Sequence, residues 1–169
     1  EIERGYSINP SGGPILWKEN KVNFIGAPGY FDFVGEVNAA LRAAEAAVIM
    51  VDAGSGIQVG TEAAWKACER YKTPRFIVIN KRDKDEFDFY KTFDELKAKF
   101  GNKLIPFSWP LSAEIDEELK EAIAMADEEL MDKYFEGEDF TEEEILNGLK
   151  KGIADGNIVP VCSSAFQLG

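Results

Sequence analysis

The 169-residue sequence contains no histidine, and this absence excludes several kinds of chemistry at once. It rules out a histidine general base, histidine metal ligands and Cys-His nucleophilic dyads. Cys68 and Cys162 are too few for a disulfide framework or a cysteine metal site. No apolar run approaches the roughly 18 residues that a membrane span needs. The charged start, Glu1 to Arg4, is unlike a signal peptide. We therefore expect no membrane partner.

Basic residues are scarce and do not cluster. The chain has 19 Lys and Arg against 31 Asp and Glu, a net charge of −12. Residues 114–144 hold 15 of these acids and only two bases, which leaves the remainder near neutral. A protein that neutralises nucleic-acid phosphates needs clustered Lys and Arg. We therefore expect no direct nucleic-acid interface, and we interpret the acidic segment as a solvated helix face.

The pattern of apolar residues predicts an α/β fold. The short runs at 14–17 and 21–25 fit an antiparallel hairpin. The continuous runs at 46–51 and 76–79 are typical of parallel strands covered on both faces. Shorter strands are expected at 103–107 and 158–161. Helices are expected at 31–41, 61–71, 87–100, 113–135 and 141–153, with Thr61 as an N-cap and a capping box at 141–144. This order indicates a sheet with helices on both faces.

The segment Asn80-Lys81-Arg82-Asp83, directly after the strand at 76–79, has the chemistry of a guanine-binding turn. The carboxylate of Asp83 can accept two hydrogen bonds, from N1–H and the exocyclic amine of guanine. Adenine offers no such pair of donors, so an unpaired carboxylate would penalise it. The stem of Lys81 can lie along the base, and Asn80 can tie the turn to its neighbours. A merely polar turn is the alternative interpretation.

Two further loops follow strands, at the sheet edge where α/β proteins bind ligands. Ser164-Ala165-Phe166 can supply a backbone N–H to guanine O6 and a hydroxyl that braces the Asn80 turn. The loop that begins at Pro28-Gly29 follows the strand at 21–25, and the backbone N–H of Gly29 is suited to a terminal phosphate.

Together with Glu3-Arg4-Gly5-Tyr6-Ser7-Ile8, these loops resemble the GTPase domain of translation elongation factor G, above all its bacterial elongation factor G-like paralogues. The segments 28–37, 132–137 and 159–162 share the likeness, which runs essentially end to end. It implies a three-layer P-loop GTPase-like sheet, mostly parallel with an N-terminal antiparallel hairpin, in one incomplete domain over 1–169. It also implies GTP or GDP as ligand, Mg²⁺ as cofactor, the ribosome as partner and a cytoplasmic location.

The resemblance also assigns roles to single residues. Ser7 stands where the family has a Thr that holds Mg²⁺, and its hydroxyl could keep that role. Tyr30 occupies the position of the water-orienting histidine, so it is the candidate catalytic residue. Gly26-Ala27 replaces the family's Asp-Thr, which removes an outer contact to the metal.

The sequence lacks Gly-x-x-x-x-Gly-Lys-Ser/Thr, the phosphate-binding loop of these GTPases. We expect the first βα unit, which carries this loop, to lie upstream of Glu1, and the chain alone to be inactive. A degenerate binding or scaffold module without hydrolysis is the alternative, and an unrelated flavodoxin-like acidic domain is a third. Without the first strand, we expect strands 22–25 and 46–51 to pair directly in parallel. Self-association through an exposed strand edge is the second possibility.

Overall fold

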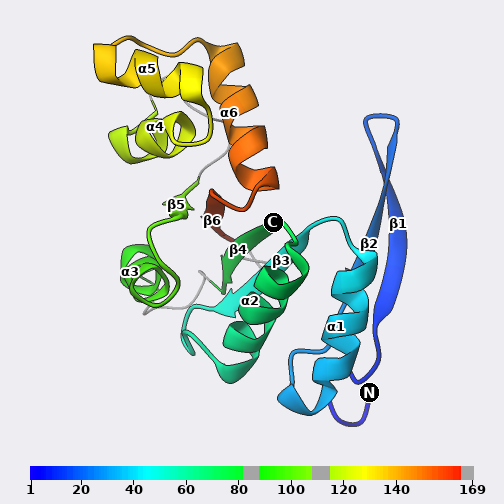
Figure 1. Cartoon of the computed structure of the whole chain (residues 1–169). Coiled ribbons are helices and arrows are strands. Elements are labelled where there is room, and N and C mark those ends of the chain that lie inside the picture. Colours follow the sequence, from blue (N-terminus) through cyan, green and yellow to red (C-terminus); the bar gives the residue numbers. More distant parts are fainter. Residues whose placement is uncertain (82–87, 108–114, 165–169) are drawn as a thin grey trace. The chain divides into compact units, whose positions relative to one another are not determined.

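The structure is a computed structural model, and it describes residues 1–81, 88–107 and 115–164. The chain divides into two compact units. The first consists of Glu1–Ala47 and Gln58–Thr73, and the second of Val48–Ile57 and Pro74–Gly169. In the described ranges the first unit holds a hairpin and two α-helices, and the second holds a four-stranded sheet and four α-helices (Figure 1).

The first unit begins with the predicted hairpin, formed by β1 (Ser11–Trp17) and β2 (Asn20–Gly26). The strands are antiparallel, and Trp17 lies opposite Asn20. Lys18 and Glu19 both have a left-handed φ, of 44° and 66°. A two-residue turn with this geometry matches the twist of the strands it connects. The hairpin is a long twisted ribbon in Figure 1, and every residue of both strands is exposed.

The helix expected at 31–41 is a 3₁₀ turn, η1 (Phe31–Phe33), followed by α1 (Val34–Ala43). The second helix, α2 (Val59–Tyr71), contacts α1 and begins earlier than predicted. Thr61 is therefore not the N-cap. Gln58 occupies that position, and its N–H donates to Thr61 Oγ1 at 3.3 Å. The helix starts there because the two side chains form a reciprocal capping box, which satisfies backbone N–H groups on both sides.

The second unit contains the predicted, mostly parallel sheet. Its strands are β3 (Ala47–Asp52), β4 (Arg75–Asn80), β5 (Leu104–Pro106) and β6 (Val159–Ser163), in the order β3-β4-β6-β5. β6 is parallel to both β4 and β5. Val159, Pro160 and Val161 are all buried, so this central strand is covered on both faces.

β3 differs from the prediction in its burial. Ile49 and Val51 are buried, whereas Val48 and Met50 are 56% and 54% exposed, so the run is not covered on both faces. Within the described residues of the second unit, β3 lies at the end of the sheet beside β4. The expected direct pairing of 22–25 with 46–51 would join the two units, so it stays a prediction.

The remaining helices are α3 (Phe89–Phe100), α4 (Glu117–Ala124), α5 (Glu128–Glu136) and α6 (Glu142–Ala154). The single helix expected at 113–135 is two helices in the described residues from 115 onward. α4 ends in tight turns, in which Ala126 N–H bonds Ile123 O and Asp127 N–H bonds Ala124 O. The Asp127 side chain then accepts from Glu129 N–H at 3.1 Å and starts α5. An Asp N-cap favours a new helix at this point.

α4, α5 and α6 form a helical lobe, drawn in yellow-green to orange in Figure 1. Its core is aliphatic and consists of Ile105, Leu119, Ile123, Leu130, Ile145, Leu149 and Ile158. Two of these residues, Ile105 and Ile158, come from β5 and from the turn before β6. The lobe and the sheet edge therefore share one core.

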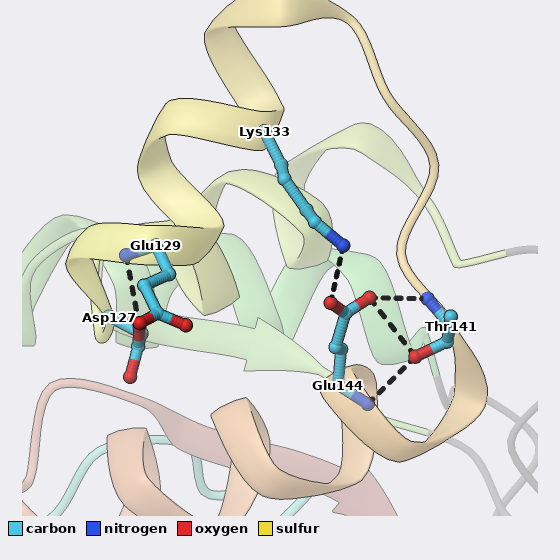
Figure 2. A network of polar contacts seen from close by, with 5 residues as sticks. All are labelled: Asp127, Glu129, Lys133, Thr141 and Glu144. Atoms are coloured by element: carbon cyan, nitrogen blue, oxygen red, sulfur yellow. Dashed lines mark hydrogen bonds and ion pairs between the residues drawn. The ribbon is translucent and has the colours of Figure 1, made fainter.

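The predicted capping box of α6 is confirmed (Figure 2). Glu144 N–H donates to Thr141 Oγ1 at 3.3 Å, and Thr141 N–H donates to Glu144 Oε2 at 2.8 Å. Lys133 from α5 donates to the other carboxylate oxygen at 2.5 Å. These contacts, led by the bond from Lys133, lower the pKa of Glu144 to about 2. None of the helices within the described ranges is both long and apolar enough to cross a membrane.

Candidate functional site

The carboxyl ends of β4 and β6 bring two of the predicted loops into contact. The strands are parallel, with Ile79 opposite Ser163, so Asn80 and Ser164 leave the sheet side by side. Ser164 Oγ donates to Asn80 Oδ1 at 3.2 Å, across 84 positions of the sequence. Ser164 N–H also donates to Ile79 O at 2.9 Å. The Ser164 hydroxyl thus holds the side chain of Asn80 just beyond the paired part of β4 and β6.

Lys81 continues the turn, and its ammonium forms an ion pair with Asp52 Oδ2. Asp52 is the last residue of β3, and its other oxygen accepts from Gly54 N–H at 2.8 Å and Ser55 N–H at 3.3 Å. The sequence analysis missed Asp52. Its only sequence signal is an Asp at the end of an apolar run, which is too common to single it out.

Three predicted base-contacting residues, Asp83, Ala165 and Phe166, lie outside the described residues. The described part of the predicted guanine site therefore consists of Asn80, Lys81 and Ser164, all in the second unit.

Cys162 precedes this edge and lies within β6. Its thiol is half-buried, and Sγ lies 3.8 Å from Ile77 O. Burial raises the pKa of Cys162. Because the nucleophilic form of cysteine is the thiolate, this residue is poorly suited to covalent catalysis.

The predicted γ-phosphate loop belongs to the first unit. Pro28 is buried, whereas Tyr30 is 56% exposed. The ring of Tyr30 packs against that of Tyr6, with centroids 4.4 Å apart and a tilt of 45°. Tyr6 directly precedes Ser7, the candidate Mg²⁺ ligand, so this contact joins two segments that the sequence singled out separately.

The backbone of Gly29 lies close to Gly60, a residue that the sequence analysis did not identify. Gly60 is the second residue of α2, and a Cβ added there would lie 2.6 Å from Gly29 O. A side chain cannot be placed at that distance from a backbone carbonyl without a shift of the loop. The Pro28-Gly29 turn therefore rests directly on the first turn of α2.

Ser7 is exposed, and its hydroxyl is a hard oxygen ligand of the kind that Mg²⁺ takes. The described residues contain no group of three or more His, Cys, Asp or Glu side chains that could hold a metal ion. Ser7 offers a single oxygen, and Mg²⁺ in nucleotide enzymes takes several of its ligands from phosphate oxygens and water.

Comparison with known proteins places this geometry in context. The family model described as the elongation factor Tu GTP binding domain matches residues 1–167. A crystal structure from Thermus thermophilus matches with a TM-score of 0.83 at 31% sequence identity, over 97% of this chain. The match covers 30% of the Thermus chain, so this chain spans less than a third of its length. The predicted α/β fold class and the predicted likeness to a translational GTPase domain are both confirmed.

Proposed function

The chain belongs to the family of elongation factor Tu GTP-binding domains, and we propose that it carries the guanine-reading part of an elongation factor G-like translational GTPase. The observation that supports this most is the Ser164–Asn80 hydrogen bond at 3.2 Å. It joins the two loops that guanine recognition requires. We also propose that both compact units belong to one GTP-binding domain, because the family match spans them.

In this proposal Asn80 and Ser164 fix the turn, the stem of Lys81 lies along the base, and Asp83 accepts the two guanine hydrogen bonds. Ala165 and Phe166 complete the loop that faces guanine O6. A carboxylate left unpaired by adenine costs binding free energy, so the turn discriminates against ATP.

The first unit supplies the phosphate side. The backbone N–H of Gly29, after Pro28, binds the terminal phosphate. Tyr30 orients the attacking water, because a phenol is both a donor and an acceptor. Ser7 would hold Mg²⁺, which when bound neutralises charge on the phosphates. The Tyr6 ring contact and the close approach of Gly60 support a fixed position of this loop.

We further propose that this chain by itself does not hydrolyse GTP. No Gly-x-x-x-x-Gly-Lys-Ser/Thr occurs in the 169 residues. In P-loop enzymes that loop and its Lys hold the β- and γ-phosphates, and phosphoryl transfer depends on this positioning. We expect GDP to bind the chain no more tightly than roughly 100 μM, the range of ligands held by a few contacts.

A degenerate scaffold without hydrolysis is the second candidate. Gly26 stands where the family has an Asp, and it lies in β2 opposite Ser11. A Cβ there would lie 3.1 Å from Ser11 Oγ, which is the end of an exposed side chain that can rotate away. The strand pairing thus permits a side chain at this position, and the family's carboxylate is absent because the residue is glycine.

The test is a competition between guanosine and adenosine for the 169-residue chain, followed by NMR, with GDP titrated by calorimetry. We expect a preference for guanosine that Asp83→Ala abolishes and Asp139→Ala, at a fully exposed position, leaves unchanged. An unchanged preference in Asp83→Ala would refute the guanine role. Low-micromolar GDP binding would refute the proposal that the chain lacks strong phosphate contacts. If neither nucleoside binds at millimolar concentration, the result would favour the scaffold.

The binding partners of this chain are also proposals. We propose that a protein with this domain acts on the ribosome, and hence in the cytoplasm. We also propose self-association of the isolated chain through the exposed hairpin. Ile15, Trp17, Val22 and Phe24 are each at least 40% exposed there, and an isolated two-stranded hairpin is marginally stable. Sedimentation velocity at increasing concentration tests this, and a strict monomer at 100 μM or so would contradict it.

A further inference from the structure

We propose that Asp52 is a positioning residue for guanine recognition, because it holds Lys81 in the conformation that contacts the base. This inference rests on the proposed function, and it assigns a role to a residue outside the predicted loops. Asp52 ends β3, next to the strand that carries the turn.

The backbone of Lys81 has a strained conformation that other contacts must stabilise. Its φ is +67°, in the left-handed region that few residues other than glycine adopt. A residue with a side chain persists there only when its surroundings compensate for the strain. Such strain is frequent at ligand-binding turns, where it preorganises the site.

Three contacts fix this turn from both sides. Ala53 N–H donates to Asn80 O at 3.0 Å, which ties the peptide before Lys81 to the end of β3. Ser164 holds the Asn80 side chain from β6. The ion pair with Asp52 then fixes the far end of Lys81. The peptide before Lys81, the side chain of Asn80 and the side chain of Lys81 are thus each bonded to a residue at the end of β3 or β6.

The two oxygens of Asp52 have separate tasks. Oδ1 accepts from Gly54 and Ser55 N–H, which orients the carboxylate through a tight turn. Oδ2 meets the ammonium of Lys81. The carboxylate is therefore oriented before Lys81 binds it, and this distinguishes it from a loose surface pair. A side chain ordered in advance loses less entropy when the base binds.

The variant Asp52→Asn separates these tasks. The Asn carbonyl can still accept from Gly54 and Ser55, but its amide cannot pair with Lys81. The matched control is Asp139→Asn, which removes a carboxylate paired with Lys120 on the exposed surface of the same unit. Both variants change the net charge equally.

The first readout is guanosine affinity, measured by NMR titration of the full 169-residue chain. We expect Asp52→Asn to weaken binding by about two- to fivefold, the range of a partly exposed ion pair. In a Lys81→Ala background the same change should have no further effect. Unaltered affinity in Asp52→Asn, or full additivity with Lys81→Ala, would overturn the proposal.

The second readout needs no nucleotide, so it separates the two proposals. A strong intraresidue amide–Hα NOE reports the left-handed φ of Lys81. We expect it in the wild type and in Asp139→Asn, and a weaker NOE in Asp52→Asn. An NOE of full strength in Asp52→Asn would overturn the positioning role. The NOE could weaken in Asp52→Asn as expected while the wild type shows no preference for guanosine. That result would refute the proposed function, but Asp52 would still fix the conformation of Lys81.

Discussion

Gly152, in the last turn of α6, gives a quantitative test of how the helical lobe supports the sheet. A Cβ added to it would lie 2.5 Å from Ile158 Cδ1 and 2.8 Å from Cγ1. Ile158 is 1% exposed, so its side chain has no free space to move into. Gly152 O also accepts the N–H groups of Asn157 and Ile158, both at 2.9 Å. The helix end and the start of β6 are therefore locked together.

The expected cost of Gly152→Ala is the balance of two opposing effects. Alanine favours a helix interior over glycine by about 1 kcal/mol. Excess atoms in a packed core cost about 1–3 kcal/mol. The shortest distances involve two successive atoms of one buried side chain, so a simple rotation cannot relieve both. We therefore place the packing cost in the upper part of this range, at about 2–3 kcal/mol, which leaves a net loss of about 1–2 kcal/mol in the free energy of unfolding.

The assay is amide hydrogen exchange, read at α4 and α6. The control is Gly35→Ala in the exposed first turn of α1, where an added Cβ meets nothing within 4 Å. That control should be neutral or stabilising by up to about 1 kcal/mol, read at α1. If Gly152→Ala stabilises its helix as much as Gly35→Ala does, the packing argument at Ile158 is wrong.

Three further predictions concern α6 and β6. Thr141→Ala should destabilise α6 by about 1 kcal/mol in urea unfolding, because it removes the N-cap, and an unchanged midpoint would contradict the cap. Folding lowers the pKa of Glu144 to about 2 from 4.5, chiefly through Lys133, so its stabilisation is present above about pH 4.5 and is lost as the pH falls towards 2. In thermal unfolding, Glu144→Gln should therefore differ most from wild type at pH 7 and converge with it near pH 2; a constant difference would contradict this. Alkylation of Cys162, followed by peptide mass spectrometry, should be slower in the folded chain than in urea, and equal rates would show that burial does not protect the thiol.

The elements that local chemistry determines were predictable from the sequence. The hairpin could be located because two apolar runs flank a short polar segment. The start of α6 could be located because Thr141 and Glu144 bond each other's backbone within one turn. Neither inference needs information from elsewhere in the chain.

The elements that depend on packing were not predictable in the same way. The apolar spacing of 113–135 continues across the break between α4 and α5, because residues of both helices enter the same core. The break at Asp127 is a local capping event inside a pattern that reads as one helix. Similarly, the run at 46–51 is apolar throughout, but Val48 and Met50 share one face of the strand and that face is exposed.

Part of the candidate site could be predicted, and the reason is the strand order. Asn80 and Ser164 follow strands that the sequence already identifies, and parallel strands end at the same edge. Asp52 and Gly60 could not be found that way. An Asp at a strand end and a Gly in a helix are common, and only the fold reveals the lysine and the carbonyl that they contact.

The register of β6 determines whether the predicted site exists. Successive side chains in a strand point to opposite faces, so a slip of one residue would move Ser164 away from Asn80. That slip is opposed close to the site, where Ile77 pairs with Val161 and Leu104 with Val159, all of them fully buried. A slip would move Val159 and Val161 to the opposite face of β6 and disturb the packing on both of its covered faces, at about 1–3 kcal/mol for each side chain that no longer fits. The hydrogen bond between the two polar loops therefore depends on apolar packing along the strand that leads to Ser164.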